Sequence, residues 1–191
     1  MTDDSQPPVL DEQTVQTLEA FADTIVPGAK RHPDDLAIAG VSDDAGAVQA
    51  GALALLQEPA GGLAPWLGGL AAMLNAHVVT YLAERDAEPP AGVPPFVALG
   101  YADRVAMVLR LVAWDNPERQ GWVNLVMFSN MAYDSAPHRH TSEALAEGHP
   151  GLHTLGFAQP ARDGRWRFPR YSYQRPLASI HPATTATGSP A

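Results

Sequence analysis

The sequence predicts a mainly α-helical protein, in which a small, irregular helical domain is followed by an extended C-terminal arm. Apolar residues recur at helical spacing through most of the first 147 residues. From residue 148 onward, glycine and proline interrupt every further pattern, and aromatic residues alternate with arginines. We therefore expect a disordered lead-in over residues 1–10, a helical domain over 11–147, an arm over 148–183 that packs on the domain or on a partner, and a disordered tail over 184–191.

The first predicted helix extends from its N-cap, Asp11, to about Val26. Its apolar positions share one face: Val15, Leu18, Phe21, Ala22 and Ile25. Pro27 ends the helix, because the residue before a proline is pushed out of the α region. Residues 27–45 are polar and rich in proline, aspartate and glycine, which predicts a long loop that is functional, bound to a partner or disordered.

Three helices are expected in the middle of the chain, over about 46–57, 64–86 and 102–113, with a proline-rich linker at 88–95. In the second, the residues in register for a buried face are Trp66, Leu70, Met73, Leu74, His77, Val78, Tyr81 and Leu82. In the third, the shared apolar face consists of Val105, Val108, Leu109 and Val112.

A clear helix start follows at Asn116, which is a suitable N-cap before Pro117 and Glu118. This helix should continue to about Ser135, and its apolar middle at 122–128 predicts a central, buried element. Thr141 can cap a further short helix that ends near residue 147. Beyond that point no regular helix is expected.

The composition excludes several classes of function. The net charge is −9, whereas binding of nucleic acid requires a basic surface. Without cysteine, the chain has no disulfides, thiolate nucleophiles or iron–sulfur clusters. The acidic, polar N-terminus lacks the features of an export signal. We also expect no run of about 18 apolar residues that could span a membrane. We therefore expect a cytoplasmic protein without membrane insertion.

Charged residues are only 17% of the chain, below the typical quarter, which points weakly to a surface covered by a partner. The arm strengthens this hypothesis, because aromatic residues and arginine are enriched at protein interfaces. The arm residues with which we expect a partner to interact are Trp166, Arg167, Phe168, Tyr171 and Tyr173.

Three polar residues follow the buried part of the central helix, namely Asn130, Tyr133 and Asp134. Because Asn130 and Asp134 are four apart, they share a helix face, where they can contact a small molecule, a partner or a neighbouring loop. Asp23 lies in the last turn of the first helix, where the helix dipole disfavours an acid. It is interpreted as a structural ion pair that fixes the following loop, with a general base or a partner contact as alternatives.

Four histidines lie close together in the later part of the chain: His138, His140, His149 and His153. Metal coordination is the functional interpretation, but the spacing disfavours it. Residues two apart on a helix face away from each other, and Pro150 and Gly151 interrupt the helix that would align the last pair. No metal site is expected. The chain also lacks a dinucleotide-binding fingerprint, so we expect no cofactor in this chain and any flavin in a partner.

A short motif spans the end of the first helix and the turn after it: Ala20-Phe21-Ala22-Asp23-Thr24-Ile25-Val26-Pro27-Gly28. A loop with glycine and acids follows, over residues 32–41. This combination resembles the opening of the gluconate 2-dehydrogenase subunit 3 family. The later segments 93–96, 128–135, 148–152 and 166–173 are similar to a soluble actinobacterial branch of unknown function, and that resemblance covers about residues 15–191.

The resemblance implies a small, helical, non-catalytic subunit of an oxidoreductase. In that family the partner is a large flavoprotein of the glucose-methanol-choline type, which carries FAD and the active site, and the small subunit supports its assembly and stability. No catalytic residue is carried over. This chain lacks the twin-arginine signal of many members, so a cytoplasmic partner in a heterodimer is expected.

Two other hypotheses remain open. The chain could be an independent, cofactor-free cyclase, dehydratase or isomerase that uses Asp23, Tyr133, Asp134 or His138 as acid–base groups, provided that these converge in one pocket. It could also be a module that binds a small apolar ligand between helices, which requires a cavity.

Overall fold

The computed structural model describes residues 9–157, 159 and 183. In these residues all regular secondary structure is helical and no strand occurs, which confirms the mainly α fold class. The elements are α1 (Glu12–Ile25), α2 (Ala52–Gln57), the 3-10 helices η1 (Pro59–Gly61) and η2 (Ala64–Trp66), α3 (Leu67–Ala83), α4 (Pro95–Ala98), α5 (Tyr101–Leu111), α6 (Arg119–Asp134), α7 (Thr141–Ala146) and α8 (Pro150–Thr154).

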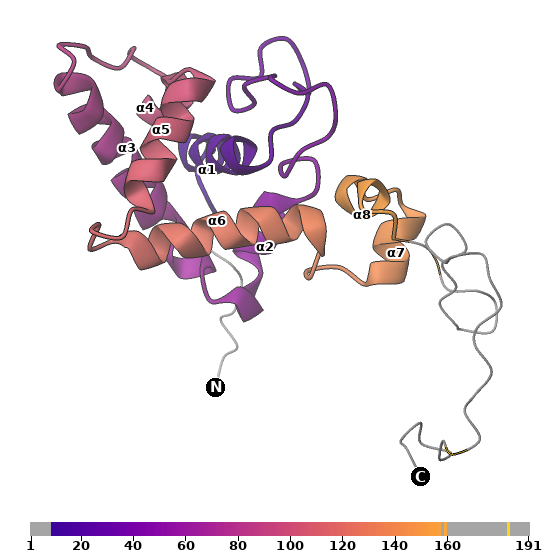
Figure 1. The fold of residues 1–191 in the computed structure, drawn as a ribbon. Coiled ribbons are helices and arrows are strands. Elements are labelled where there is room, and N and C mark those ends of the chain that lie inside the picture. Colours follow the sequence, from indigo (N-terminus) through magenta and orange to yellow (C-terminus); the bar gives the residue numbers. More distant parts are fainter. Residues whose placement is uncertain (1–8, 158, 160–182, 184–191) are drawn as a thin grey trace. The chain divides into compact units, whose positions relative to one another are not determined.

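α1 is the central helix of the first compact unit, which ends at Phe157. It contacts α2, α3, α4, α5 and α6. As predicted, Asp11 caps it, and its side chain accepts a hydrogen bond of 2.8 Å from the Thr14 N–H. α6 extends across the unit beside α1, with α3 and α5 near its start and α8 near its end (Figure 1). Its buried Trp122 joins Phe21 and Phe96 in the main core.

Two predicted helix starts lie later than expected. α2 begins at Ala52, because Gly51 adopts the left-handed conformation with φ 91° and separates the helix from the turns at 47–50. α6 begins at Arg119. Asn116 still bonds at this start, since its Oδ1 accepts from the Glu118 N–H at 2.9 Å, but this closes a local turn before the helix.

The buried faces of two helices are rotated relative to the prediction. α5 buries Arg104, Met107, Val108 and Leu111, and it leaves Leu109 exposed. α3 buries Leu67, Ala71, Leu74, Val78 and Tyr81. Trp66 and Met73, which were expected on that face, are 68% and 40% exposed.

The expectation that no regular helix follows residue 147 was wrong. α8 forms at Pro150–Thr154, where a proline occupies the first position, which needs no N–H. The imidazole Nδ1 of His149 accepts from the Leu152 N–H at 3.3 Å and so acts as the cap. The first residues assigned to the arm therefore belong to the helical unit. Of the disordered lead-in predicted over residues 1–10, residues 9 and 10 are described, and Leu10 packs against the core. Residues 1–8, the predicted tail at 184–191 and most of the arm lie outside the described residues.

Candidate functional site

The Asp23 carboxylate, in the last turn of α1, fixes the loop that follows the helix. It accepts hydrogen bonds from the Gly28 N–H at 3.0 Å and from the Ala39 N–H at 2.8 Å. Burial raises the pKa of Asp23, and the two backbone hydrogen bonds and Arg104 act in the opposite direction. Asp23 is only 1% exposed, so it offers no surface to a partner, and its contacts are those of the structural interpretation.

Arg104 holds the same loop from α5. Its buried guanidinium donates to the carbonyl oxygens of Ala37 and Leu36 in the loop, at 2.7 and 3.0 Å, and to those of Val97 and Leu99 near α4, at 2.6 and 3.1 Å. Sequence reasoning missed this residue. The available signal was its spacing, because Arg104 precedes the buried Met107, Val108 and Leu111 by three, four and seven residues and so shares their helix face.

The polar residues at the end of α6 form a surface network. Asn130 donates to the Asp134 carboxylate at 2.7 Å, and the Ser135 hydroxyl donates to its other oxygen at 2.6 Å. Tyr133 lies against α8, because a Cβ at Gly151 would stand 1.8 Å from the Tyr133 carbonyl oxygen. The structure thus brings Asn130 and Asp134 together at the surface, apart from the buried network of Asp23.

The other predicted site residues are those of the arm, and they lie outside the described residues. They are Trp166, Arg167, Phe168, Tyr171 and Tyr173. Their role in binding a partner stays a prediction.

Three of the four histidines bond or pack within the fold. His149 is buried, and because its Nδ1 accepts from Leu152, its Nε2 carries the hydrogen that is donated to the Ala50 carbonyl at 3.1 Å. The His153 Nε2 lies 3.2 Å from the Leu145 carbonyl oxygen. His138 packs beside Gly51, and burial lowers its pKa. Among the described residues, no three histidine or acidic side chains are arranged to hold a metal ion.

α3 exposes a face without charge, which we call the α3 face. Its members recur at helical spacing: Gly68, Gly69, Ala72, Met73, Ala76, Val79, Thr80 and Ala83. Trp66 stands at the N-terminal end of this face. Between residues 64 and 83 the sequence contains no Asp, Glu, Lys or Arg. In a chain of net charge −9, such a face is a candidate contact surface.

The same segment corrects the expectation that no stretch could span a membrane. Ala64–Ala83 is long and apolar enough to do so by length and composition, and 28% of it is buried within the fold. The inner side of α3 is an ordinary core surface, which contacts α1 and α4. There Asn75 donates to the Thr17 hydroxyl at 3.2 Å and accepts from the Phe96 N–H at 3.0 Å.

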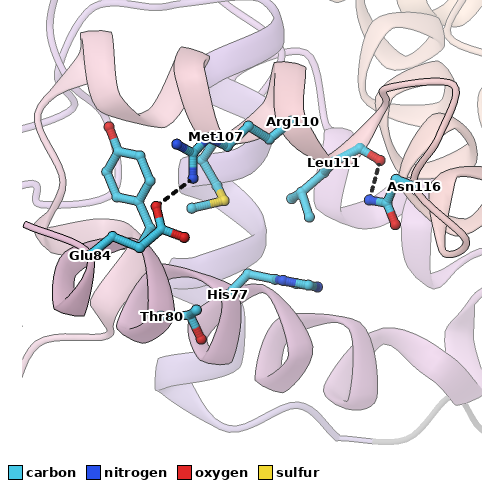
Figure 2. A pocket seen from close by; sticks show the side chains of 8 residues that line it. His77, Thr80, Glu84, Met107, Arg110, Leu111 and Asn116 are labelled. Atoms are coloured by element: carbon cyan, nitrogen blue, oxygen red, sulfur yellow. Dashed lines mark hydrogen bonds and ion pairs between the residues drawn. The ribbon is translucent and has the colours of Figure 1, made fainter.

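A pocket of about 220 Å³ lies beside the α3 face, between α3, α5 and the turn before α6. Figure 2 shows Met107 and Leu111 entering it from α5, opposite His77 and Glu84 from α3. The remaining lining residues are Thr80, Tyr81, Arg110 and Asn116. A second pocket of about 270 Å³ lies next to the long loop, at Arg31 and Asp35. Neither pocket is lined by Asp23, Tyr133, Asp134 or His138, the acid–base groups of the enzyme hypothesis.

His77 and Glu118 form a pair at the edge of the first pocket. The His77 Nε2 lies 2.7 Å from the Glu118 Oε2, which also accepts from the Trp122 indole N–H at 3.2 Å. The His77 ring meets the Trp122 ring edge-on, with 5.9 Å between centroids. The hydrogen bond from His77 lowers the pKa of Glu118, whereas burial acts in the opposite direction. Sequence reasoning assigned His77 only to the core.

Comparison with known proteins identifies a family. A family model described as "Family of unknown function (DUF5987)" matches residues 12–191. No curated protein and no solved structure matches the chain.

Proposed function

Since the chain belongs to a family of unknown function, DUF5987, we propose its role from the fold and the surface: it is an accessory subunit that binds and stabilises a larger FAD-dependent oxidoreductase of the glucose-methanol-choline type. The chain itself carries no catalytic role and no cofactor in this proposal, and the two proteins form a cytoplasmic heterodimer.

The α3 face is the observation that carries the proposal. A soluble monomer rarely leaves a long helix face without a single charge, because charged side chains keep surfaces solvated. Here Trp66, Met73 and Val79 are large apolar residues on or beside that face, at exposures of 68%, 40% and 46%. Depletion of charge together with aromatic residues and methionine is typical of the core of a protein–protein interface.

A protein partner fits this face better than a lipid bilayer does. A membrane-spanning α3 would bring α1 and α4, which pack on its inner side, into the hydrocarbon region. The same would hold for the Glu118 carboxylate, which bonds to His77 of α3, and burial of a charge in lipid is costly. A partner that covers only the outer face requires neither.

The family-like motif at residues 20–28 supports the proposal only through the fold. Asp23 and Gly28 of that motif bond to each other and fix the long loop. The motif therefore has a structural reason in this chain, and its resemblance to the subunit 3 family supports a similar fold at this position. The choice of a flavoprotein as partner rests on that resemblance.

Co-purification tests the proposal. The tagged chain is isolated from its native host, and the eluate is examined by size-exclusion chromatography, mass spectrometry and flavin absorbance. We expect a yellow complex of one copy of this chain with one large oxidoreductase. A colourless, monodisperse chain without a large oxidoreductase would contradict the proposal.

A further inference from the structure

The pocket between α3 and α5 is lined by residues of this chain and shares Thr80 with the α3 face. Most of its polar groups are already engaged. Tyr81 donates to Asp103 at 2.6 Å, and Arg110 bonds to Glu84 at 3.0 Å. Asn116 donates to the Leu111 carbonyl at 2.8 Å and accepts from the Glu118 N–H.

His77 is the exception. An ionised carboxylate accepts hydrogen bonds and donates none, so the hydrogen between His77 and Glu118 belongs to the His77 Nε2. Glu118 is held in place by the Trp122 N–H and by its own backbone bond to Asn116. In the neutral ring, the His77 Nδ1 is then the acceptor, and this ring lines the pocket with its side chain 37% exposed.

Charges of both signs surround the pocket. Glu84 lies 3.0 Å from Arg110 and 3.7 Å from Arg85, and the carboxylates of Glu118 and Asp103 bond to His77 and Tyr81 of the lining. A cationic ligand would meet the two guanidinium groups, and an anionic ligand would meet the carboxylates of Glu84 and Glu118. Met107 and Leu111 supply the apolar side. The volume of about 220 Å³ is below that of pockets for drug-sized molecules, which restricts the occupant to a small one.

We propose that this pocket binds a small, neutral molecule with an apolar body and a hydroxyl group, whose O–H donates a hydrogen bond to the His77 Nδ1. The apolar body lies against Met107 and Leu111. Glu118 is a positioning residue, because it determines which ring nitrogen of His77 accepts.

Two probes of equal size separate the hydrogen bond from simple apolar filling. Cyclohexanol carries a donor hydroxyl, and cyclohexanone carries only an acceptor. Each is titrated into the full chain at about pH 8, where histidine rings are ordinarily neutral, and proton–nitrogen correlation spectra of the histidine rings are recorded. We expect cyclohexanol to shift the His77 Nδ1 signal in a saturable manner and to bind at least about fivefold more tightly than cyclohexanone, as one hydrogen bond predicts.

Cyclohexylammonium serves as the charged probe, and the His77→Phe variant removes the acceptor but keeps a ring against Trp122. The matched control is His32→Phe, at an exposed position in the loop. The preference for cyclohexanol should disappear in His77→Phe and persist in His32→Phe. Equal affinity for alcohol and ketone, tighter binding of the ammonium, or no saturable shift in the unmodified chain would each overturn the proposal, even if His77→Phe fails to fold.

Discussion

The Asp23 carboxylate and the Arg104 guanidinium lie 3.9 Å apart in the interior, and both bond to the backbone of the same loop. Asp23 accepts from two N–H groups, and Arg104 donates to four carbonyl oxygens, two of them in that loop. The two side chains therefore bond to backbone groups of residues 27–45 that no helix or strand would otherwise satisfy.

Substitution of Asp23 should show how strongly the loop depends on this pair. Asp23→Asn turns one acceptor oxygen into a donor that faces a backbone N–H, and it removes the carboxylate that acts most strongly on the buried Arg104. We expect a loss of about 3–5 kcal/mol in the free energy of unfolding, measured by urea denaturation. The matched variant Asp34→Asn, at an exposed position of the same loop, should change it by less than about 0.5 kcal/mol. Equal effects would contradict the role of Asp23.

The contact between α8 and α6 should tolerate no side chain at Gly151. A Cβ there would stand 1.8 Å from the Tyr133 carbonyl oxygen, and this backbone atom cannot move without shifting α6. Gly151→Ala should lower the free energy of unfolding by at least about 1–3 kcal/mol. Gly69→Ala is the control, because nothing lies within 4 Å of its Cβ position and alanine favours the helix. It should raise stability by about 0.5–1 kcal/mol. A stable Gly151→Ala protein would show that α8 packs differently.

Acid should weaken the link between α3 and α6 through Glu118. Its pKa is lower in the folded than in the unfolded chain, so the unfolded state binds more protons across the acidic range. The stabilisation is therefore complete above the ordinary glutamate pKa and is lost as the pH falls through the folded value. Urea unfolding measured between neutral pH and about pH 3 should show a smaller loss for Glu118→Gln than for the unmodified chain. Identical pH profiles would exclude this contribution.

The α3 face makes a prediction about partner binding. Val79→Glu places a charge on the face at a position that is 46% exposed, so the fold should be retained. We expect affinity for the oxidoreductase to fall at least about tenfold. Val41→Glu makes the same change at a loop position that is 53% exposed, and it should leave affinity within about twofold. The dissociation constants of both variants for the purified partner are compared. An equal loss of affinity in the two variants, or no loss in either, would place the interface elsewhere.

Much of the helical pattern was predictable, because it depends on local signals. Asp11 has a standard capping side chain, and it caps α1 as expected. The helix α8 was not predicted, because its N-cap is a histidine and histidine is not among the residues preferred at that position. The inner face of α5 was misassigned because Arg104 occupies a core position. Two of its carbonyl partners, Ala37 and Leu36, lie in the loop, far from Arg104 in the sequence. The other two, Val97 and Leu99, lie in α4 and directly after it.

The candidate site was less predictable than the fold. The apolar residues of α3 could be recognised as helical, but which of them face solvent depends on where α1 and α4 pack. Trp66 and Met73 were therefore expected in the core. The pairing of His77 with Glu118 joins residues that are 41 positions apart, and no spacing rule connects them.

Flavin occupancy of the partner tests the central claim most directly. The large oxidoreductase that co-purifies with this chain is produced alone and together with it, and bound FAD and thermal unfolding are measured for both preparations. If the chain is an accessory subunit, the partner made alone should contain less FAD, unfold at a lower temperature, and recover both when the chain is co-produced. A partner that is fully flavinated, equally stable and fully active without this chain would contradict the account.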